Sequence, residues 1–188
     1  EHVKFDNFKF FTIAQIKKLK DRTLTMNGVS KAYAMTGWRI GYAAGPKDII
    51  SAIRKIQSQS TSNPSSISQA AAIEALNGTQ SFIKKRAKSF SDRRKFVVNY
   101  LNSIDGISCL MPKGAFYVFP SCKKLISKKT KIKNDTEFVK KLLEKQNVAV
   151  VQGSAFGLHG YFRISYATSM KKLKFAMSRI KTFCESLR

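Results

Sequence analysis

A lysine and an arginine eight residues apart, Lys31 and Arg39, have the clearest potential for chemistry in this 188-residue chain. A lysine held in a buried turn beside another cation loses its proton more easily, because desolvation and charge repulsion lower its pKa, and the free amine can attack a carbonyl. A guanidinium such as that of Arg39 offers a fixed fork of donors that suits a phosphate dianion. By residue type alone, solvated positions are the more common ones for a lysine and an arginine in a basic chain.

The elements around Lys31 are expected to place it in a turn between two strands. A β-prone run at residues 23–26 ends at Asn27-Gly28, and a second run at 39–44 is closed by Gly45-Pro46. Pro46 suits the first position of a helix at residues 47–58, whose isoleucines recur on one face. A strand, a turn, a strand and a helix are therefore predicted in that order.

The rest of the chain predicts more helix and then a mixed α+β segment. After a polar loop at 59–66, helices are expected at 67–76 and, as one long helix, at 80–103. Strands are expected at 107–111, 115–119, 148–151 and 161–166, and helices at 136–145 and after Ser169. Asn134 or Asp135 is predicted to cap the first of these helices and Ser169 the second.

Positive charge dominates the composition, with 35 Lys and Arg against 11 Asp and Glu, a net charge of +24. Such a charge attracts nucleic acid or anionic lipid, so a basic nucleic-acid-binding module is an alternative hypothesis. Most of the excess is lysine scattered along the chain without interleaved aromatic residues, which favours solvated helix faces. Nucleic-acid binding is therefore expected to be absent despite the charge.

The three cysteines, Cys109, Cys122 and Cys184, are widely spaced and only two histidines accompany them. This pattern predicts no disulfide framework and no metal site. No apolar run approaches the ~20 residues of a membrane-spanning helix, and no signal-peptide pattern opens the sequence. A cytoplasmic protein without membrane association is the expectation.

The segment around Lys31 resembles a known family. Its sequence, Asn-Gly-Val-Ser-Lys-Ala-Tyr-Ala-Met-Thr-Gly-Trp-Arg-Ile-Gly-Tyr at 27–42, is similar to the lysine motif of the class I aminotransferases, in the fold-type-I group of pyridoxal phosphate enzymes. The sequence of this segment most resembles that of the bacterial-type aspartate aminotransferases. The resemblance implies that Lys31 is the catalytic Schiff-base lysine and that Arg39 and Ser30 bind the cofactor phosphate. The family commonly has a further hydroxyl three residues before the lysine, where this chain has Gly28.

Two later segments resemble the same family. Pro-Lys-Gly-Ala-Phe-Tyr at 112–117 is similar to a strand of its small domain, and Phe-Arg-Ile-Ser-Tyr-Ala at 162–167 to the segment whose arginine grips the substrate α-carboxylate. The resemblance therefore implies that Arg163 binds substrate. Ser62-Asn63-Pro64 resembles a loop near the partner subunit's active site, but the arginine that reads a distal carboxylate would fall at Ser58.

The resemblance implies an α/β fold: part of the large domain that binds pyridoxal phosphate at 1–79, a long interdomain helix at 80–104 and a small α+β C-terminal domain at 105–188. It also implies transamination between an amino acid and a 2-oxo acid, and the sequence of the motif favours aspartate as the amino acid. The intact protein is expected to be a homodimer. Another transaminase or a lyase of the same fold is the alternative. Because only the C-terminal half of such an enzyme is matched, we expect the chain alone to be inactive.

Overall fold

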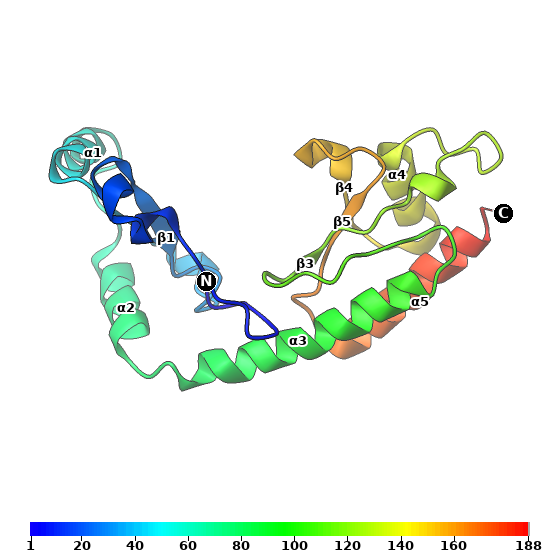
Figure 1. Cartoon of the computed structure of the whole chain (residues 1–188), viewed down its shortest axis with the longest axis horizontal. Helices are drawn as coiled ribbons and strands as arrows, with labels where there is room; N and C mark the ends of the chain where they lie inside the picture. The colour runs from blue at the N-terminus through cyan, green and yellow to red at the C-terminus, as the bar shows by residue number, and fades with distance from the viewer. Residues whose placement is uncertain (188) are drawn as a thin grey trace. The chain divides into compact units, whose positions relative to one another are not determined.

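The computed structural model describes residues 1–187, and the chain divides into two compact units. The first unit comprises residues 1–2 and Lys9–Lys85, and the second comprises Val3–Phe8 and the chain from Arg86 onward. The chain thus enters the second unit briefly near its start, and the later division lies inside the long helix α3 (Ser81–Asn102). Figure 1 follows the chain through both units.

The first unit is built on an antiparallel pair of strands, β1 (Thr25–Gly28) and β2 (Gly41–Ala44). Two short 3-10 helices, Ile13–Gln15 and Lys17–Arg22, precede β1, and a third, Thr36–Trp38, lies in the connection between the strands. Helices α1 (Lys47–Ser60) and α2 (Ser66–Asn77) follow. Pro46 was expected as the first helical residue, but it precedes α1 as its N-cap residue.

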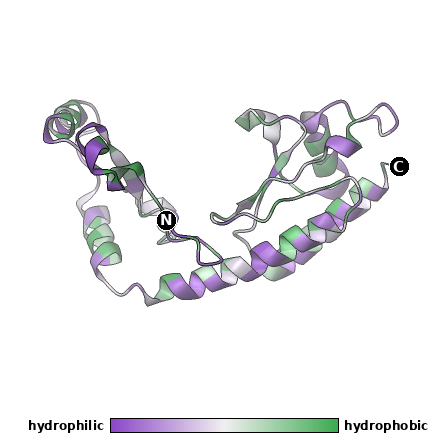
Figure 2. Ribbon diagram, in the orientation of Figure 1, coloured by the Kyte–Doolittle hydropathy of each residue, from purple (hydrophilic) through white to green (hydrophobic). Residues whose placement is uncertain are grey.

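The first unit buries few apolar side chains. Its core consists of Val29, Ile40 and Ala72, with Tyr33 and Met35 packed against them. Hydrophobic residues recur along α1 and are green in Figure 2, yet all residues of that helix except Ile50 are exposed. The isoleucine face predicted for this helix is present in the sequence, but within residues 1–187 none of the residues of α1 is buried.

The second unit is an antiparallel three-stranded sheet covered by helices. The strand order is β3-β5-β4, with β3 at Tyr117–Val118, β5 at Phe162–Ser165 and β4 at Val151–Gln152. Helix α4 (Asp135–Gln146) packs against α5 (Met170–Glu185), and α3 adds one face to the same core. Short 3-10 helices lie at Lys123–Leu125 and at Gly153–Phe156, the latter termed η5.

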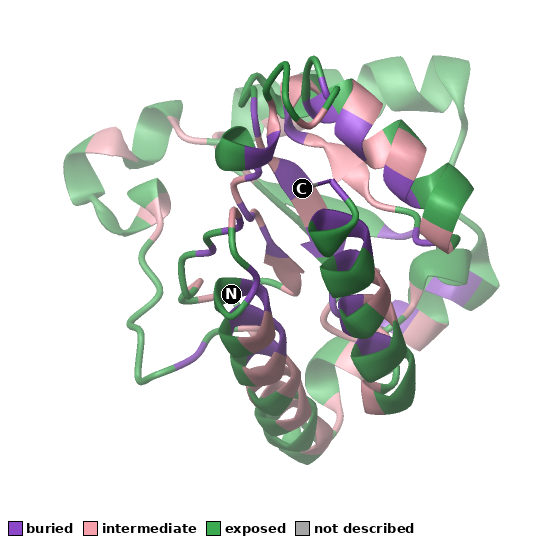
Figure 3. Cartoon of the chain, turned by 90° about the vertical axis from the view of Figure 1, so that its right-hand side faces the viewer, coloured by how far each residue is buried: buried purple, intermediate pink, exposed green. Residues whose placement is uncertain are grey.

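The core of the second unit is large and continuous. It contains 22 buried residues, which come from α3, the sheet, α4, α5 and the segments that connect them. Phe138 lies at its centre, fully buried, with its ring centroid 5.1 Å from that of Phe162 and 5.2 Å from that of Phe183. Figure 3 shows these buried residues along the strands and on one side of the helices.

The segment Val3–Phe8 is fastened to the second unit. Phe5 donates its N–H to the Lys113 carbonyl at 3.0 Å, and Ala115 donates to the Val3 carbonyl at 2.8 Å. The buried guanidinium of Arg94, on α3, pairs with both carboxylate oxygens of Asp6 at 2.7 and 2.9 Å and lies over the Phe5 ring. Its Nη1 also donates to the Pro112 carbonyl at 2.7 Å. A contact this distant in sequence was not predicted.

The helices and their caps follow the sequence patterns closely. The long helix expected at 80–103 is α3, and the side chains of Asn134 and Ser169 cap α4 and α5 by accepting from Glu137 N and Lys172 N. The strand expected at 107–111 was wrong, since only Ser108 forms a bridge there, to Ser121. The amide side chain of Asn102 instead bonds both backbone groups of Cys109, at 2.7 and 3.0 Å, where a neighbouring strand would otherwise bind.

Three further observations bear on the sequence-based exclusions. Within residues 1–187, no helix combines the length and the apolar character needed to cross a membrane. The same residues contain no group of three or more His, Cys, Asp or Glu side chains arranged to hold a metal ion. Cys109, Cys122 and Cys184 are buried, and burial raises the pKa of Cys109 to about 11 and that of Cys122 to about 12.

Candidate active site

The candidate cofactor residues all lie in the connection between β1 and β2. The two strands pair with Gly28 opposite Gly41, and Val29 donates to the Ile40 carbonyl at 3.4 Å, which closes the connection at its base. A Cβ atom at position 28 would lie 3.1 Å from the Ile40 carbonyl oxygen. This close approach of the two strands favours glycine at the place where the family often has a hydroxyl.

Inside the connection the chain turns tightly around Ser30 and Lys31. Tyr33 donates to the Val29 carbonyl at 3.3 Å, Ala34 to the Lys31 carbonyl at 3.3 Å and Met35 to the Ser30 carbonyl at 3.1 Å. The prediction that Lys31 lies in a turn between two strands is confirmed. Ser30 is half-buried in the same turn.

The expected burial of Lys31 is not found, because its side chain is exposed in the described chain. The physical reason is the small core of the first unit. Val29 and Ile40 are buried at the base of the connection, but no further apolar layer of residues 1–187 covers the turn above them. Burial of the lysine would require surface that these residues do not supply.

Arg39 follows the third 3-10 helix with a left-handed backbone, at φ 54° and ψ 46°. Its Nη1 donates to the Thr36 carbonyl at 2.9 Å, which ties the exposed side chain to its own turn. The other N–H groups of Arg39 have no hydrogen-bond partner within residues 1–187, so they are available to an anion. A guanidinium held in this way can donate two parallel bonds to a phosphate.

Arg163 belongs to the second unit and lies on β5, the central strand of its sheet. The residues on either side of it, Phe162 and Ile164, are buried in the core, so the half-buried Arg163 side chain lies on the opposite face of the sheet. Its guanidinium carbon is 4.5 Å from the ring centroid of Tyr117 and 4.5 Å from that of Phe156.

The sequence of the chain matches that of a known protein family. The family model described as "Aminotransferase class I and II" matches residues 2–180. The chain belongs to this family. Pyridoxal phosphate is the cofactor of the family, and the α/β fold that the sequence predicted is the fold of its solved members.

Individual aminotransferases resemble the chain over its whole length. It is 58% identical to the aspartate aminotransferase of Rhizobium meliloti and 57% identical to a probable aspartate/prephenate aminotransferase of Rickettsia typhi, in each case across 100% of this chain. The chain spans about half of these relatives, 47% and 48% of their lengths.

Solved structures agree with these relatives. The crystal structure of the Rhizobium meliloti aspartate aminotransferase superposes with a TM-score of 0.94, covering 98% of this chain and 47% of that one. An aromatic aminotransferase from Pyrococcus horikoshii, 38% identical, superposes with a TM-score of 0.89 over 99% of this chain and 49% of its own.

The residues of the connection fit pyridoxal phosphate by their chemistry. The cofactor of an aminotransferase presents an aldehyde and a phosphate, and this connection presents a primary amine, a hydroxyl and a guanidinium with unused donors. Lys31 would hold the aldehyde, and Ser30 and Arg39 would hold the phosphate.

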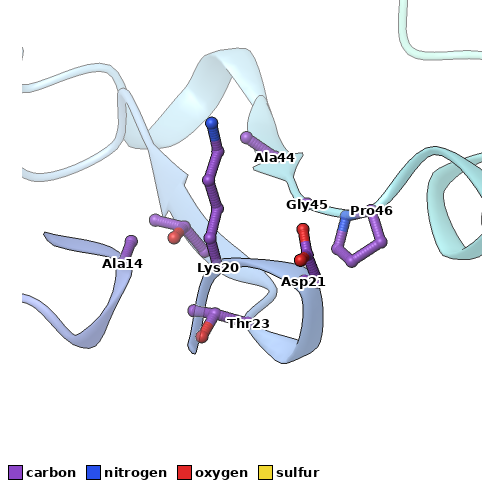
Figure 4. A pocket seen from close by; sticks show the side chains of 8 residues that line it. Ala14, Lys20, Asp21, Thr23, Ala44, Gly45 and Pro46 are labelled. Atoms are coloured by element: carbon purple, nitrogen blue, oxygen red, sulfur yellow. The ribbon is translucent and has the colours of Figure 1, made fainter. Parts of the chain in front are cut away.

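A pocket in the first unit lies away from these residues. It has a volume of about 400 Å³ and is lined by Ala14, Lys20, Asp21, Thr23, Thr25, Ala44, Gly45 and Pro46. Figure 4 shows Lys20 and Asp21 extending from the second 3-10 helix, Lys17–Arg22, toward the end of β2. None of the predicted site residues lines it, so chemistry rather than concavity identifies the candidate active site in this aminotransferase chain.

Two aromatic residues beside Arg163 were missed by the sequence reasoning. Tyr117 belongs to a segment whose resemblance to the family was noted, but its alternation with Val118 gave no sign of a guanidinium partner. Phe156 ends a short 3-10 helix after a glycine, a pattern that carries no functional signal. The register of β3 against β5, which is absent from the sequence, brings Tyr117 to Arg163.

Proposed function

We propose that this chain supplies half of the active site of a pyridoxal phosphate-dependent aminotransferase, with Lys31 as its catalytic residue. The observation that carries the proposal is the β1–β2 connection, which places a lysine, a serine and an arginine in one closed turn. The family match supports the same reading. Bound pyridoxal phosphate would supply the electron sink for the reaction.

Each residue has one task in this proposal. The Lys31 amine would hold the aldehyde group of pyridoxal phosphate, and as a free amine it would accept the proton from the substrate α-carbon. Ser30 and Arg39 bind and orient the phosphate, and the bond from Arg39 to the Thr36 carbonyl keeps the guanidinium in place. Arg163 binds the α-carboxylate of the amino acid or 2-oxo acid, since a guanidinium meets a carboxylate with two parallel bonds.

Aspartate is the proposed amino acid substrate. Two of the similar proteins carry aspartate in their names, and one of these names adds prephenate. Ser58 stands where an arginine for a distal carboxylate would fall, so the side-chain carboxylate would be read by residues outside this chain. Another transaminase of the same fold remains the second candidate, because an aromatic aminotransferase also superposes on the chain.

The organisation of the whole enzyme is also a proposal. We assign residues 1–79 to the large domain, 80–104 to an interdomain helix and 105–188 to the small domain. We further propose a homodimer, with the exposed Ser62-Asn63-Pro64 loop near the partner's site. A cytoplasmic location is proposed as well, since the three cysteines are buried and widely spaced in the sequence. The comparisons do not favour the nucleic-acid alternative, whose support is the net charge alone.

The anchor is tested by capture of pyridoxal phosphate on the 188-residue chain. After borohydride reduction, peptide mass spectrometry should find the adduct on Lys31 well above other lysines, and Lys31→Ala should remove it. Lys20→Ala is the matched control, since Lys20 is an exposed lysine of the same unit that lines the pocket away from the candidate site. Equal labelling of Lys31 and Lys20 would contradict the assignment.

The phosphate site is tested by comparing pyridoxal phosphate with pyridoxal. Arg39→Leu should weaken capture of the phosphorylated form and leave capture of pyridoxal unchanged, because only the former carries the dianion. Turnover of aspartate and a 2-oxo acid should be absent in the isolated chain. It should appear when the chain replaces the corresponding half of the Rhizobium meliloti enzyme, to which it is 58% identical.

A further inference from the structure

Arg163 is flanked by aromatic rings and has no carboxylate partner in the described part of the chain. None of the ion pairs formed within residues 1–187 involves it. The contrast is Arg94, whose charge is met by both oxygens of Asp6. The Arg163 guanidinium carbon instead lies 4.5 Å from each of two ring centroids, those of Tyr117 and Phe156.

The ring of Tyr117 is held by the sheet. Tyr117 stands opposite Ser165 in the β3–β5 register, and Arg163 is two residues from Ser165 on the same strand. Residues two apart on a strand share a face, and diagonal neighbours on adjacent strands are within reach of aromatic and long side chains. The neighbouring Phe116 ring, 4.4 Å away between centroids, further restricts Tyr117.

The ring of Phe156 is held by the anchoring of η5. The buried carboxylate of Asp135 accepts from Ser154 N at 2.7 Å, and Gly153 donates to the Tyr161 carbonyl at 2.7 Å. A Cβ at Gly153 would collide with the carbonyl oxygens of Leu158 and Tyr161, so the chain packs here as tightly as glycine allows. An edge-to-face contact with Phe119, 5.6 Å between centroids, holds the ring itself.

When an aromatic ring packs against a guanidinium, the N–H groups of the guanidinium can still donate hydrogen bonds. A cation over a ring is attracted to the ring face, whereas the N–H donors of a guanidinium radiate in its own plane. The two rings can therefore fix the plane of the Arg163 guanidinium and leave its N–H donors unoccupied. A carboxylate partner within the protein would occupy these donors. A fixed plane reduces the ordering cost when a carboxylate ligand binds.

We propose that Tyr117 and Phe156 are positioning residues that hold the guanidinium of Arg163 ready for a carboxylate ligand. The inference rests on the proposed role of Arg163 and adds to it the two side chains that make the arginine a preorganised site. Removal of either ring should weaken carboxylate binding by about two- to fivefold, the equivalent of one exposed cation–π contact. Removal of both should have a larger effect.

The test uses NMR of the 188-residue chain, with acetate as the carboxylate probe. The Nε–Hε signal of Arg163, assigned by its loss in Arg163→Gln, should be displaced by ring currents and should shift on addition of acetate. Tyr117→Leu and Phe156→Leu should move this signal and raise the fitted Kd for acetate. Tyr117→Phe, which keeps the ring, should restore the wild-type behaviour.

A matched control lies in the same unit. Arg179 is 4.0 Å from the ring centroid of Phe175, so Phe175→Leu removes a comparable contact on α5, a different element from the strand that carries Arg163. It should alter the Arg179 signal and leave the Arg163 signal and the Kd unchanged. Methyl spectra of every variant establish that the unit is folded.

Two results would overturn the inference and are distinguishable from each other. If the Arg163 signal and the Kd are unchanged in Tyr117→Leu and Phe156→Leu, the rings do not position the arginine, and the proposed function stands. If acetate fails to shift Arg163 in the wild-type chain while the ring variants do move its signal, the proposed carboxylate role of Arg163 is itself wrong.

Discussion

The two units of the chain differ in how much of their hydrophobic surface they bury. The second unit closes a core of 22 residues, whereas the first buries Val29, Ile40 and Ala72. The first unit also exposes many large apolar side chains, among them Phe11, Met26, Ile56, Ile67 and Ile73. Burial of apolar area is the main favourable term in folding. The second unit is therefore expected to be stable alone, and the first to depend on surface from elsewhere.

The difference also separates the proposed tasks of the site residues. Lys31, Ser30 and Arg39 belong to the unit with the small core, and Arg163 belongs to the unit with the large one. The arginine that would bind substrate is thus preorganised in the chain as it stands. The lysine that would bind cofactor is exposed, so burial of its amine would require surface that residues 1–187 do not supply.

The largest expected contrast comes from truncating one apolar residue in each unit. Phe138→Ala should lower the free energy of unfolding by about 3–5 kcal/mol, because it leaves a cavity among Phe162 and Phe183. Ile56→Ala, at a position that is 69% exposed, should change it by less than about 0.5 kcal/mol. Urea unfolding followed by circular dichroism measures both. Similar losses in the two variants would remove the distinction between the units.

The next effect concerns the ion pair that fastens Val3–Phe8 to the second unit. The hydrogen bond from Arg94 holds the pKa of Asp6 below its usual value. A carboxyl whose folded pKa is lowered stabilises the fold above its unfolded pKa, and the contribution is lost as pH falls through the folded value. Asp6→Asn should therefore destabilise the chain at neutral pH, and the difference from wild type should vanish in acid.

Thermal unfolding across a pH series measures this effect. Asp92→Asn is the control, because Asp92 is an exposed carboxylate on the same helix, α3, and forms no ion pair within residues 1–187. A pH-independent difference between Asp6→Asn and wild type would show that the charge of Asp6 does not matter.

A smaller contrast separates the helix caps of the two units. Asn134 accepts a hydrogen bond from Glu137 N at 2.9 Å, so Asn134→Ala should cost about 1 kcal/mol. Ser65 occupies the equivalent position of α2 but its side chain makes no capping bond. Ser65→Ala should leave the unfolding midpoint in urea unchanged. Equal shifts for the two variants would contradict the cap assignment.

The smallest effect on stability is expected from charging the exposed face of α2. Ile67 and Ile73 are 72% and 61% exposed, so Ile67→Lys removes little packing. The unfolding free energy should change by less than about 0.5 kcal/mol, while light scattering should show less self-association, because a large exposed apolar patch promotes association. A cooperative loss of structure in Ile67→Lys would mean that this face is packed in solution.

Local patterns predicted the helices, and pairings between distant residues explain what was missed. Helix α3 and the capping residues Asn134 and Ser169 follow from periodicity and side-chain chemistry within a few residues. The strand expected at 107–111 was lost because the Asn102 side chain binds Cys109. No local sequence pattern predicts that a side chain will take the place of a neighbouring strand.

The candidate site divides in the same way. The turn that carries Lys31 was predicted from Asn27-Gly28 and from the family resemblance. Exposure of Lys31 was not, because burial depends on how much surface the remaining chain supplies. The contact of Phe156 with Arg163 depends on the anchoring of a loop by Asp135, and burial of Arg94 against Asp6 joins residues 88 positions apart.

The reactivity of the three buried cysteines reports how often the second unit opens. Thiol reagents react with the thiolate, and Cys109 and Cys122 are both covered and raised in pKa while the unit is closed. The first unit contains no cysteine. The rate at which a thiol reagent modifies these side chains therefore measures opening of the second unit alone. Opening of the first unit does not contribute to this rate.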